Sequence, residues 1–149
     1  MRQLILVSHG DLAKSYLTSL DMIAGGHDNV TAITFDCEIS KTLLGDQIEV
    51  ALKPDAQDQM HKTRCTRPDA QEVIIVVDLP GGMPCNVVLE RYLTDERITI
   101  LASLNLPMIL ELYLNLGQAD YQMSQVIKTA ICNTYDVKQQ LSNQTEDDE

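Results

Sequence analysis

The feature that most constrains the fold of this chain is a run of five consecutive apolar residues at 73–77 (VIIVV). A strand with one face in water alternates apolar and polar side chains, whereas a strand covered on both faces is apolar throughout. The run is short for a helix and consists of β-branched residues, which favour strands. It therefore predicts a strand inside a sheet that has helices on both of its faces.

Further segments of the chain continue this pattern. Three more apolar segments predict strands at residues 4–7, 30–35 and 98–102. Apolar residues at helical spacing predict helices near residues 12–23, 44–52, 88–93, 107–114 and 126–141. Alternating strands and helices predict an α/β fold with a mostly parallel, doubly wound sheet in the flavodoxin-like order 2-1-3-4. We expect one domain over residues 1–141, a surface loop within residues 53–71, and an acidic, disordered tail over residues 142–149.

Charge and composition exclude several classes of function. The formal net charge of −11 disfavours nucleic acid and anionic membrane surfaces, because both are bound by clustered Lys and Arg. The N-terminal apolar run is too short for a signal peptide, and no stretch approaches the about 20 apolar residues of a spanning helix, so we expect a cytoplasmic protein. The four cysteines have no CxxC spacing, so neither a disulfide framework nor a zinc site is indicated, and most of them are predicted to be free thiols.

Two polar residues follow strands that the predicted order places side by side. His9 comes directly after the first strand, and Asp78 comes directly after the third. Open parallel sheets bind ligands beyond the carboxyl ends of their strands, where the strand order reverses. An imidazole there can accept a phosphoryl group on one nitrogen while the other nitrogen donates a hydrogen bond to the carboxylate.

The residues around this pair suit a transient phosphate. Gly81 and Gly82 let backbone N–H groups approach an anion, and Pro84 suits the first turn of a following helix. Gly10 likewise leaves the backbone N–H groups at the start of another helix accessible to an anion. A histidine after a strand is more often structural than catalytic, and an aspartate before Gly-Gly is often a turn former, so both readings stay open on spacing alone.

Other candidate sites are weaker. A metal site formed by His9, Asp78 and Cys85 is conceivable but lacks ligand spacing, so we predict no metal and no cofactor. We expect His27 and His61 to be solvated, because both lie in polar turns or loops.

Three motifs in order carry a family resemblance. VSHG at 7–10, VDLPGGMPCN at 77–86 and NLPM at 105–108 resemble the enzyme IIA domain of the mannose family of the bacterial phosphoenolpyruvate-dependent sugar phosphotransferase system. The resemblance implies that His9 is the phosphoacceptor and that Asp78 orients it. It also implies a relay from the carrier HPr to His9 and then to a histidine of enzyme IIB, so that the membrane permease is reached only indirectly.

The same resemblance implies further roles. The phosphoryl group would lie against Gly10, Gly81 and the backbone amides of Gly82 and Met83, with Asn86 and Asn105 in support. The family is usually a homodimer, which implies an additional edge strand exchanged near the C-terminus. The family's serine in the Gly-Gly-Ser turn is Met83 here, so we expect the phosphate to be held more by backbone than by side chains.

Two alternatives stay open beside the free-standing phosphocarrier. One is the related phosphoryl donor subunit of dihydroxyacetone kinase, although that domain usually continues into further phosphocarrier domains. The other is a non-catalytic regulatory or binding module that responds to phosphorylation of His9. Failure to pass the phosphoryl group onward would favour this second alternative.

Overall fold

One parallel sheet forms the centre of the molecule. The computed structural model describes residues 2–53, 72–118 and 120–146. Its strands are β1 (Gln3–His9), β2 (Val30–Phe35), β3 (Val73–Val77) and β4 (Ile98–Ala102), all parallel and in the order β2-β1-β3-β4. The predicted α/β class and strand order are confirmed. The described ranges contain these four strands and no fifth, so the additional edge strand stays a prediction.

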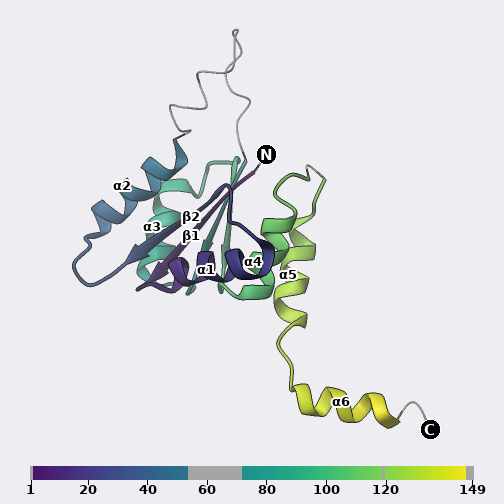
Figure 1. Ribbon diagram of the computed structural model, residues 1–149. Helices are drawn as coiled ribbons and strands as arrows, with labels where there is room; N and C mark the ends of the chain where they lie inside the picture. Colours follow the sequence, from purple (N-terminus) through teal and green to yellow (C-terminus); the bar gives the residue numbers. More distant parts are fainter. Residues whose placement is uncertain (1, 54–71, 119, 147–149) are drawn as a thin grey trace.

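Helices cover both faces of this sheet (Figure 1). They are α1 (Leu12–Ala24), α2 (Lys41–Leu52), α3 (Met83–Tyr92), α4 (Leu106–Leu114), α5 (Met123–Cys132) and α6 (Val137–Glu146). One apolar cluster joins α1, α4 and α5 to one face, and a second joins α2 and α3 to the other. Leu4 and Leu6 of β1 face the first cluster, whereas Ile5 and Val7 face the second. The central strands are therefore apolar at successive positions, as strands covered on both faces must be.

The C-terminal region corrects one prediction from helical spacing. The single helix expected near residues 126–141 is two helices, α5 and α6, separated by residues 133–136. The Asn133 side chain donates to the Thr129 carbonyl oxygen, and Asp136 Oδ1 accepts the N–H groups of Lys138 and Gln139. Asn and Asp side chains that bond nearby backbone in this way end one helix and begin the next. Apolar spacing alone does not reveal such a break.

Helix α6 extends away from the sheet and its covering helices (Figure 1). Its backbone is helical through residues 142–146, part of the segment that the sequence assigned to a disordered tail. The domain boundary at residue 141 stays a prediction.

Some predictions concern residues at the limits of the described ranges. The expected loop, apart from Lys53 at its start, lies outside them, as do His61 and Cys65. Cys37, Cys85 and Cys132 are free thiols, as predicted. No helix within the described ranges combines the length and the apolar character needed to cross a bilayer.

Candidate functional site

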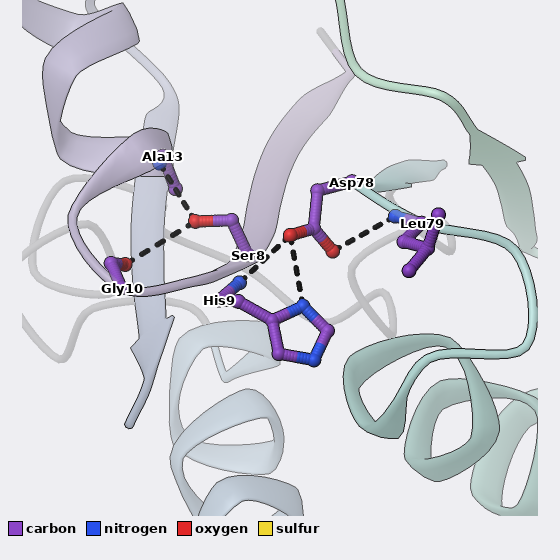
Figure 2. A network of polar contacts seen from close by, with 6 residues as sticks. All are labelled: Ser8, His9, Gly10, Ala13, Asp78 and Leu79. Carbon is purple, nitrogen blue, oxygen red and sulfur yellow. Dashed lines mark hydrogen bonds and ion pairs between the residues drawn. The ribbon is translucent and has the colours of Figure 1, made fainter. Parts of the chain in front are cut away.

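His9 and Asp78 lie in direct contact at the carboxyl end of the sheet (Figure 2). His9 is the last residue of β1, and Asp78 follows β3, the parallel neighbour whose Val77 pairs with Val7. His9 Nδ1 lies 2.9 Å from Asp78 Oδ2. The structure thus brings together the two residues that the topological rule for parallel sheets had placed at one edge.

Hydrogen bonds fix the carboxylate of Asp78. Its Oδ2 also accepts the backbone N–H of His9 at 2.8 Å, and its Oδ1 accepts the N–H of Leu79 at 2.8 Å. The Asp78 side chain is 11% exposed, whereas the His9 side chain is 44% exposed. The Asp78 carboxylate is therefore fixed in place, while the His9 ring that it contacts is accessible to solvent. When Nδ1 carries the proton that is donated to Asp78, Nε2 is left with a free lone pair that can act as a nucleophile.

A buried hydroxyl shapes the loop that carries His9. Ser8 is fully buried, and its Oγ accepts the N–H of Ala13 at 2.8 Å and donates to the Gly10 carbonyl oxygen at 3.4 Å (Figure 2). The hydroxyl ties the end of β1 to the first turn of α1. Gly10 has a φ of +54°, which glycine adopts without strain, and its N–H donates to the Phe35 carbonyl oxygen at 2.8 Å.

An aromatic ring contacts His9 from the neighbouring strand. Phe35 ends β2 and pairs with His9 in the parallel register. The two ring centroids lie 5.6 Å apart, edge to face. Neither Phe35 nor Ser8 was singled out from the sequence. The signal for Phe35 was available, because the predicted second strand ends there and the predicted order places it beside the first.

The turn after Asp78 leads into α3, and some of its backbone N–H groups already donate hydrogen bonds within the turn. Gly81 has a φ of +75°, and the Gly82 N–H donates to the Leu79 carbonyl oxygen at 3.1 Å. The Asn86 side chain donates to the Gly81 carbonyl oxygen at 3.1 Å, which closes the turn against α3. The first N–H groups of a helix have no partner within it, so the amide of Met83 at the start of α3 is a donor for an anion.

Asn105 lies apart from this arrangement. It follows the edge strand β4, its Oδ1 accepts the Met108 N–H at 3.0 Å, and its Nδ2 donates to the Ser103 carbonyl oxygen at 3.3 Å. Asn105 is therefore the N-cap of α4. The structure brings together His9, Gly10, Asp78, Gly81, Gly82, Met83 and Asn86 at one end of the sheet, and it places Asn105 one strand away.

The chemistry open to this site is that of a nucleophilic imidazole beside a carboxylate. Within the described ranges, no three His, Cys, Asp or Glu side chains lie close enough together to hold a metal ion. A held carboxylate, an accessible ring nitrogen and free amides at a helix start can bind and transfer an anionic group.

Comparison with known proteins gives concordant matches. Residues 3–131 match the family described as PTS system fructose IIA component (EIIA-man). The PTS system fructose-specific EIIA component of Bacillus subtilis (strain 168) is 30% identical over 111 residues, which cover 74% of this chain and 68% of that protein. The PTS system sorbose-specific EIIA component of Lacticaseibacillus casei is 31% identical over 113 residues, which cover 76% of this chain and 72% of that protein.

The fold matches solved structures of the same kind. The PTS IIA protein associated with the fucose utilization operon from Streptococcus pneumoniae superposes with a TM-score of 0.76 at 25% sequence identity. The match covers 94% of this chain and 96% of that one. The component EIIA from Streptococcus agalactiae superposes with a TM-score of 0.69 at 29% identity, covering 93% of this chain and 99% of that one.

Proposed function

Because this chain belongs to the EIIA-man family of PTS system fructose IIA components, and so serves phosphotransfer in a sugar phosphotransferase system, we propose that it is a relay protein that carries the phosphoryl group on His9. In this proposal HPr is the donor and a cognate enzyme IIB is the acceptor. The observation that carries it is the 2.9 Å contact between His9 Nδ1 and Asp78 Oδ2, which leaves Nε2 as the nucleophile.

The transfer follows from the protonation of the ring. The Nε2 lone pair of His9 forms a bond to phosphorus as the P–N bond to the donor's histidine breaks, and the donor's imidazole leaves with the bonding electrons. The Nδ1 proton of His9 stays in its hydrogen bond to Asp78. The phosphorylated ring then carries a positive charge, which the adjacent carboxylate stabilises. Transfer to enzyme IIB reverses these roles.

Backbone amides supply the stabilisation of the phosphoryl oxygens in this proposal. The start of α3 follows Gly82 directly, and a helix N-terminus attracts anions through its free N–H groups and its dipole. The Met83 side chain contributes no hydroxyl, so its N–H is the donor. The Gly82 N–H can contribute only if it leaves the Leu79 carbonyl oxygen, to which it donates in this structure.

The proposal includes the setting of the protein. We place it in the cytoplasm, where the family's donor HPr is phosphorylated, and we propose that it is a homodimer. The support for a dimer lies at β4, one of the two edge strands of the described sheet, and at α5, where the large apolar side chains of Ile127 and Ile131 are exposed. Exposed apolar surface of this kind marks interaction sites.

The test is the intact mass of the purified protein after incubation with phosphoenolpyruvate, enzyme I and HPr. We expect a gain of one phosphoryl group that is labile in acid, stable in base and absent from His9→Ala. His27→Ala is the matched control, because His27 also has its Nδ1 on a carboxylate, 2.6 Å from Asp21 Oδ1, but lies at the far end of α1. Loss of the phosphoryl group in His27→Ala, or its retention in His9→Ala, would overturn the assignment.

Addition of candidate enzyme IIB proteins then separates the relay from the regulatory alternative. A relay loses its phosphoryl group to a cognate IIB, and the mass returns to that of the unmodified chain. A protein that is phosphorylated normally but passes the group to none of the IIB proteins of its own cell is a phosphorylation-responsive module instead.

A further inference from the structure

The backbone at Gly82 gives no reason for a glycine. Its φ of −68° and ψ of 167° are extended values that any residue adopts. Gly82 is also the N-cap of α3, where Ser, Thr, Asp or Asn would stabilise the helix at least as well as glycine. Neither torsion angles nor helix capping therefore requires a residue without a side chain at this position.

The ring of His9 does give a reason. A Cβ atom added to Gly82 would lie 2.8 Å from Cε1 of His9, closer than real Cβ contacts come, and 3.2 Å from the Leu79 carbonyl oxygen. The imidazole thus lies in the space into which a side chain at position 82 would project. By contrast, a Cβ on Gly81 or Gly117 would meet nothing within 4 Å.

Phe35 contacts the His9 ring on the side opposite Gly82. Phe35 belongs to β2 and Gly82 follows β3, and these two strands flank β1 on opposite sides. The Phe35 ring meets His9 edge to face at 5.6 Å, and Asp78 holds Nδ1 at 2.9 Å. The imidazole is thus limited by Phe35 on one side, by Gly82 on the other and by the carboxylate at one nitrogen.

We propose that Gly82 is a positioning residue for His9, whose missing side chain provides the space in which the ring keeps Nδ1 on Asp78 and Nε2 accessible. The inference rests on the proposed phosphotransfer and adds to it a requirement on the shape of the site. Cε1 lies between the two ring nitrogens, so a methyl group that displaces Cε1 shifts both of them. The Leu79 carbonyl oxygen prevents the added group from moving aside.

The predicted consequence is loss of rate without loss of fold. A displacement of the reacting atom by a fraction of an ångström to 1 Å costs up to about 100-fold in rate. We therefore expect Gly82→Ser to accept the phosphoryl group about 10- to 100-fold more slowly than the wild type. Serine is a good N-cap, so this variant keeps α3 stable while it introduces the obstructing Cβ. Gly117→Ala is the matched control, an exposed glycine with no neighbour for its new methyl group.

Two measurements on the full chain test the proposal. One is the rate of phosphorylation by phosphorylated HPr, and the other is the pattern of ¹⁵N NMR shifts of the His9 ring, which reports which nitrogen carries the proton. We expect Gly82→Ser to slow phosphorylation and to change the ring from one Nδ1–H form to a mixture with Nε2–H. Its unfolding midpoint, measured separately to check the fold, should stay that of the wild type. Gly117→Ala should match the wild type in both measurements.

The outcomes separate this inference from the proposed function. A Gly82→Ser variant with wild-type ring shifts and a wild-type rate overturns the positioning role and leaves the relay intact. A wild type that HPr does not phosphorylate overturns the relay. The ring shifts of Gly82→Ser, which need no phosphoryl donor, still decide the positioning role in that case. A slower rate with unchanged ring shifts also overturns it, since the effect would then not act through the His9 ring.

Discussion

Two regions of the sheet differ in how far a single chain completes them. At the carboxyl end of the central strands β1 and β3, polar groups are hydrogen-bonded within the chain, whereas the edge at β4 leaves apolar surface exposed. At the end of β1 and β3, the carboxylate of Asp78 accepts three hydrogen bonds, two of them from His9 and one from Leu79. The hydroxyl of Ser8 is buried and bonded. Every group that the proposed chemistry uses on this side comes from a single copy of the chain.

The outer edge is different. Strand β4 is only partly buried along Ile98–Leu101 and exposed at Ala102, whereas β3 beside it is buried throughout. A groove next to β4 is lined by apolar side chains that include Ile100, Leu101, Ile127 and Ile131. The exposed apolar residues continue along the C-terminal segment to Tyr135, Val137 and Leu141.

The difference separates two requirements of the proposed relay, a prepared site and a covered sheet edge. The site is organised in advance, so it needs no second copy to form. Among the described residues, the β4 edge leaves apolar surface and unpaired strand backbone in water, and natural proteins usually cover such edges. We therefore expect changes at the site to alter the rate of transfer with little effect on assembly, and changes at the edge to do the reverse.

The largest expected effect is that of Asp78→Asn. The amide can present either its oxygen or its NH₂ group to His9 Nδ1, so it no longer fixes the ring in the form with a free Nε2. We expect the initial rate of phosphorylation by HPr, followed by intact mass, to fall by about 10²- to 10⁴-fold. The unfolding midpoint should also fall, because in either orientation the NH₂ group faces a backbone N–H that the carboxylate accepts, that of His9 or that of Leu79.

The matched control for this change is Asp21→Asn, which alters a second histidine–carboxylate pair in the described ranges, at His27. It should leave the rate of phosphorylation unchanged. A rate for Asp78→Asn within twofold of the wild type would remove the orienting role of Asp78.

The edge is tested by Ile127→Glu combined with Ile131→Glu. Both side chains are exposed on α5 and line the groove beside β4, so two charges there should weaken a symmetric dimer, on the order of 100-fold in Kd. Sedimentation velocity over a range of concentrations measures this. The rate of phosphorylation should stay that of the wild type.

Lys128→Glu is the control for this double change, since it replaces a positive with a negative charge at an exposed position of the same helix and so lowers the net charge by two, as the double change does. We expect it to leave the dimer intact. A wild type that sediments as a monomer at all concentrations would contradict the proposed dimer.

Ser8→Ala should have a smaller effect, which we expect on the free energy of unfolding rather than on assembly. Removal of the buried hydroxyl leaves the Ala13 N–H without its acceptor, which costs about 1–3 kcal/mol of the free energy of unfolding. Urea titration measures the loss. Ser19→Ala is the control, because its hydroxyl donates to the Ser15 carbonyl oxygen on the surface of α1, and we expect a change within about 0.5 kcal/mol. Equal losses in the two variants would refute a special role for Ser8.

The smallest expected effect is a pH dependence near the edge region. Burial raises the pKa of Tyr121 to about 12, and its hydrogen bond to Glu111 acts in the same direction. The unfolded pKa is about 10, so this contribution to stability is complete below about pH 10 and is lost as the pH rises to about 12. Tyr121 is partly exposed, so solvent screening reduces the effect of this shift, and we expect a loss of about 1 kcal/mol over that window in urea titrations and a shallower loss in Tyr121→Phe. Identical pH slopes in Tyr121→Phe and the wild type would show that another group titrates.

The sequence predicted the fold closely where burial is simple. Three of the expected strands coincide with β2, β3 and β4, at residues 30–35, 73–77 and 98–102. A strand in a sheet that is covered on both faces is mostly apolar, so it can be recognised in the sequence. The first strand was predicted too short, since β1 continues through the polar residues Ser8 and His9. The split between α5 and α6 was missed, because it depends on hydrogen bonds of Asn133 and Asp136 rather than on apolar spacing.

The site was predictable only in part. Strand order alone places His9 beside Asp78, and the structure shows that contact. The contacts of Ser8 with Ala13, and of the His9 ring with Phe35 and Gly82, depend on side-chain directions within a few ångströms. A one-dimensional pattern does not encode such directions. Strand order could have placed Phe35 beside His9, but it could not show that the two rings meet edge to face.

The hydrogen bonds that continue past the ends of the central strands have a consequence for motion. The His9 amide donates to the Asp78 carboxylate, and the Gly10 amide donates to the Phe35 carbonyl oxygen. The Asp78 amide donates to the Val7 carbonyl oxygen, so the hydrogen bonding of the sheet continues into the site. Groups bonded in this way open only with the cooperative unit to which they belong. We therefore expect these amides to exchange with deuterium as slowly as those of buried β3. A donor protein would then meet a surface that is already in its reactive arrangement at each encounter.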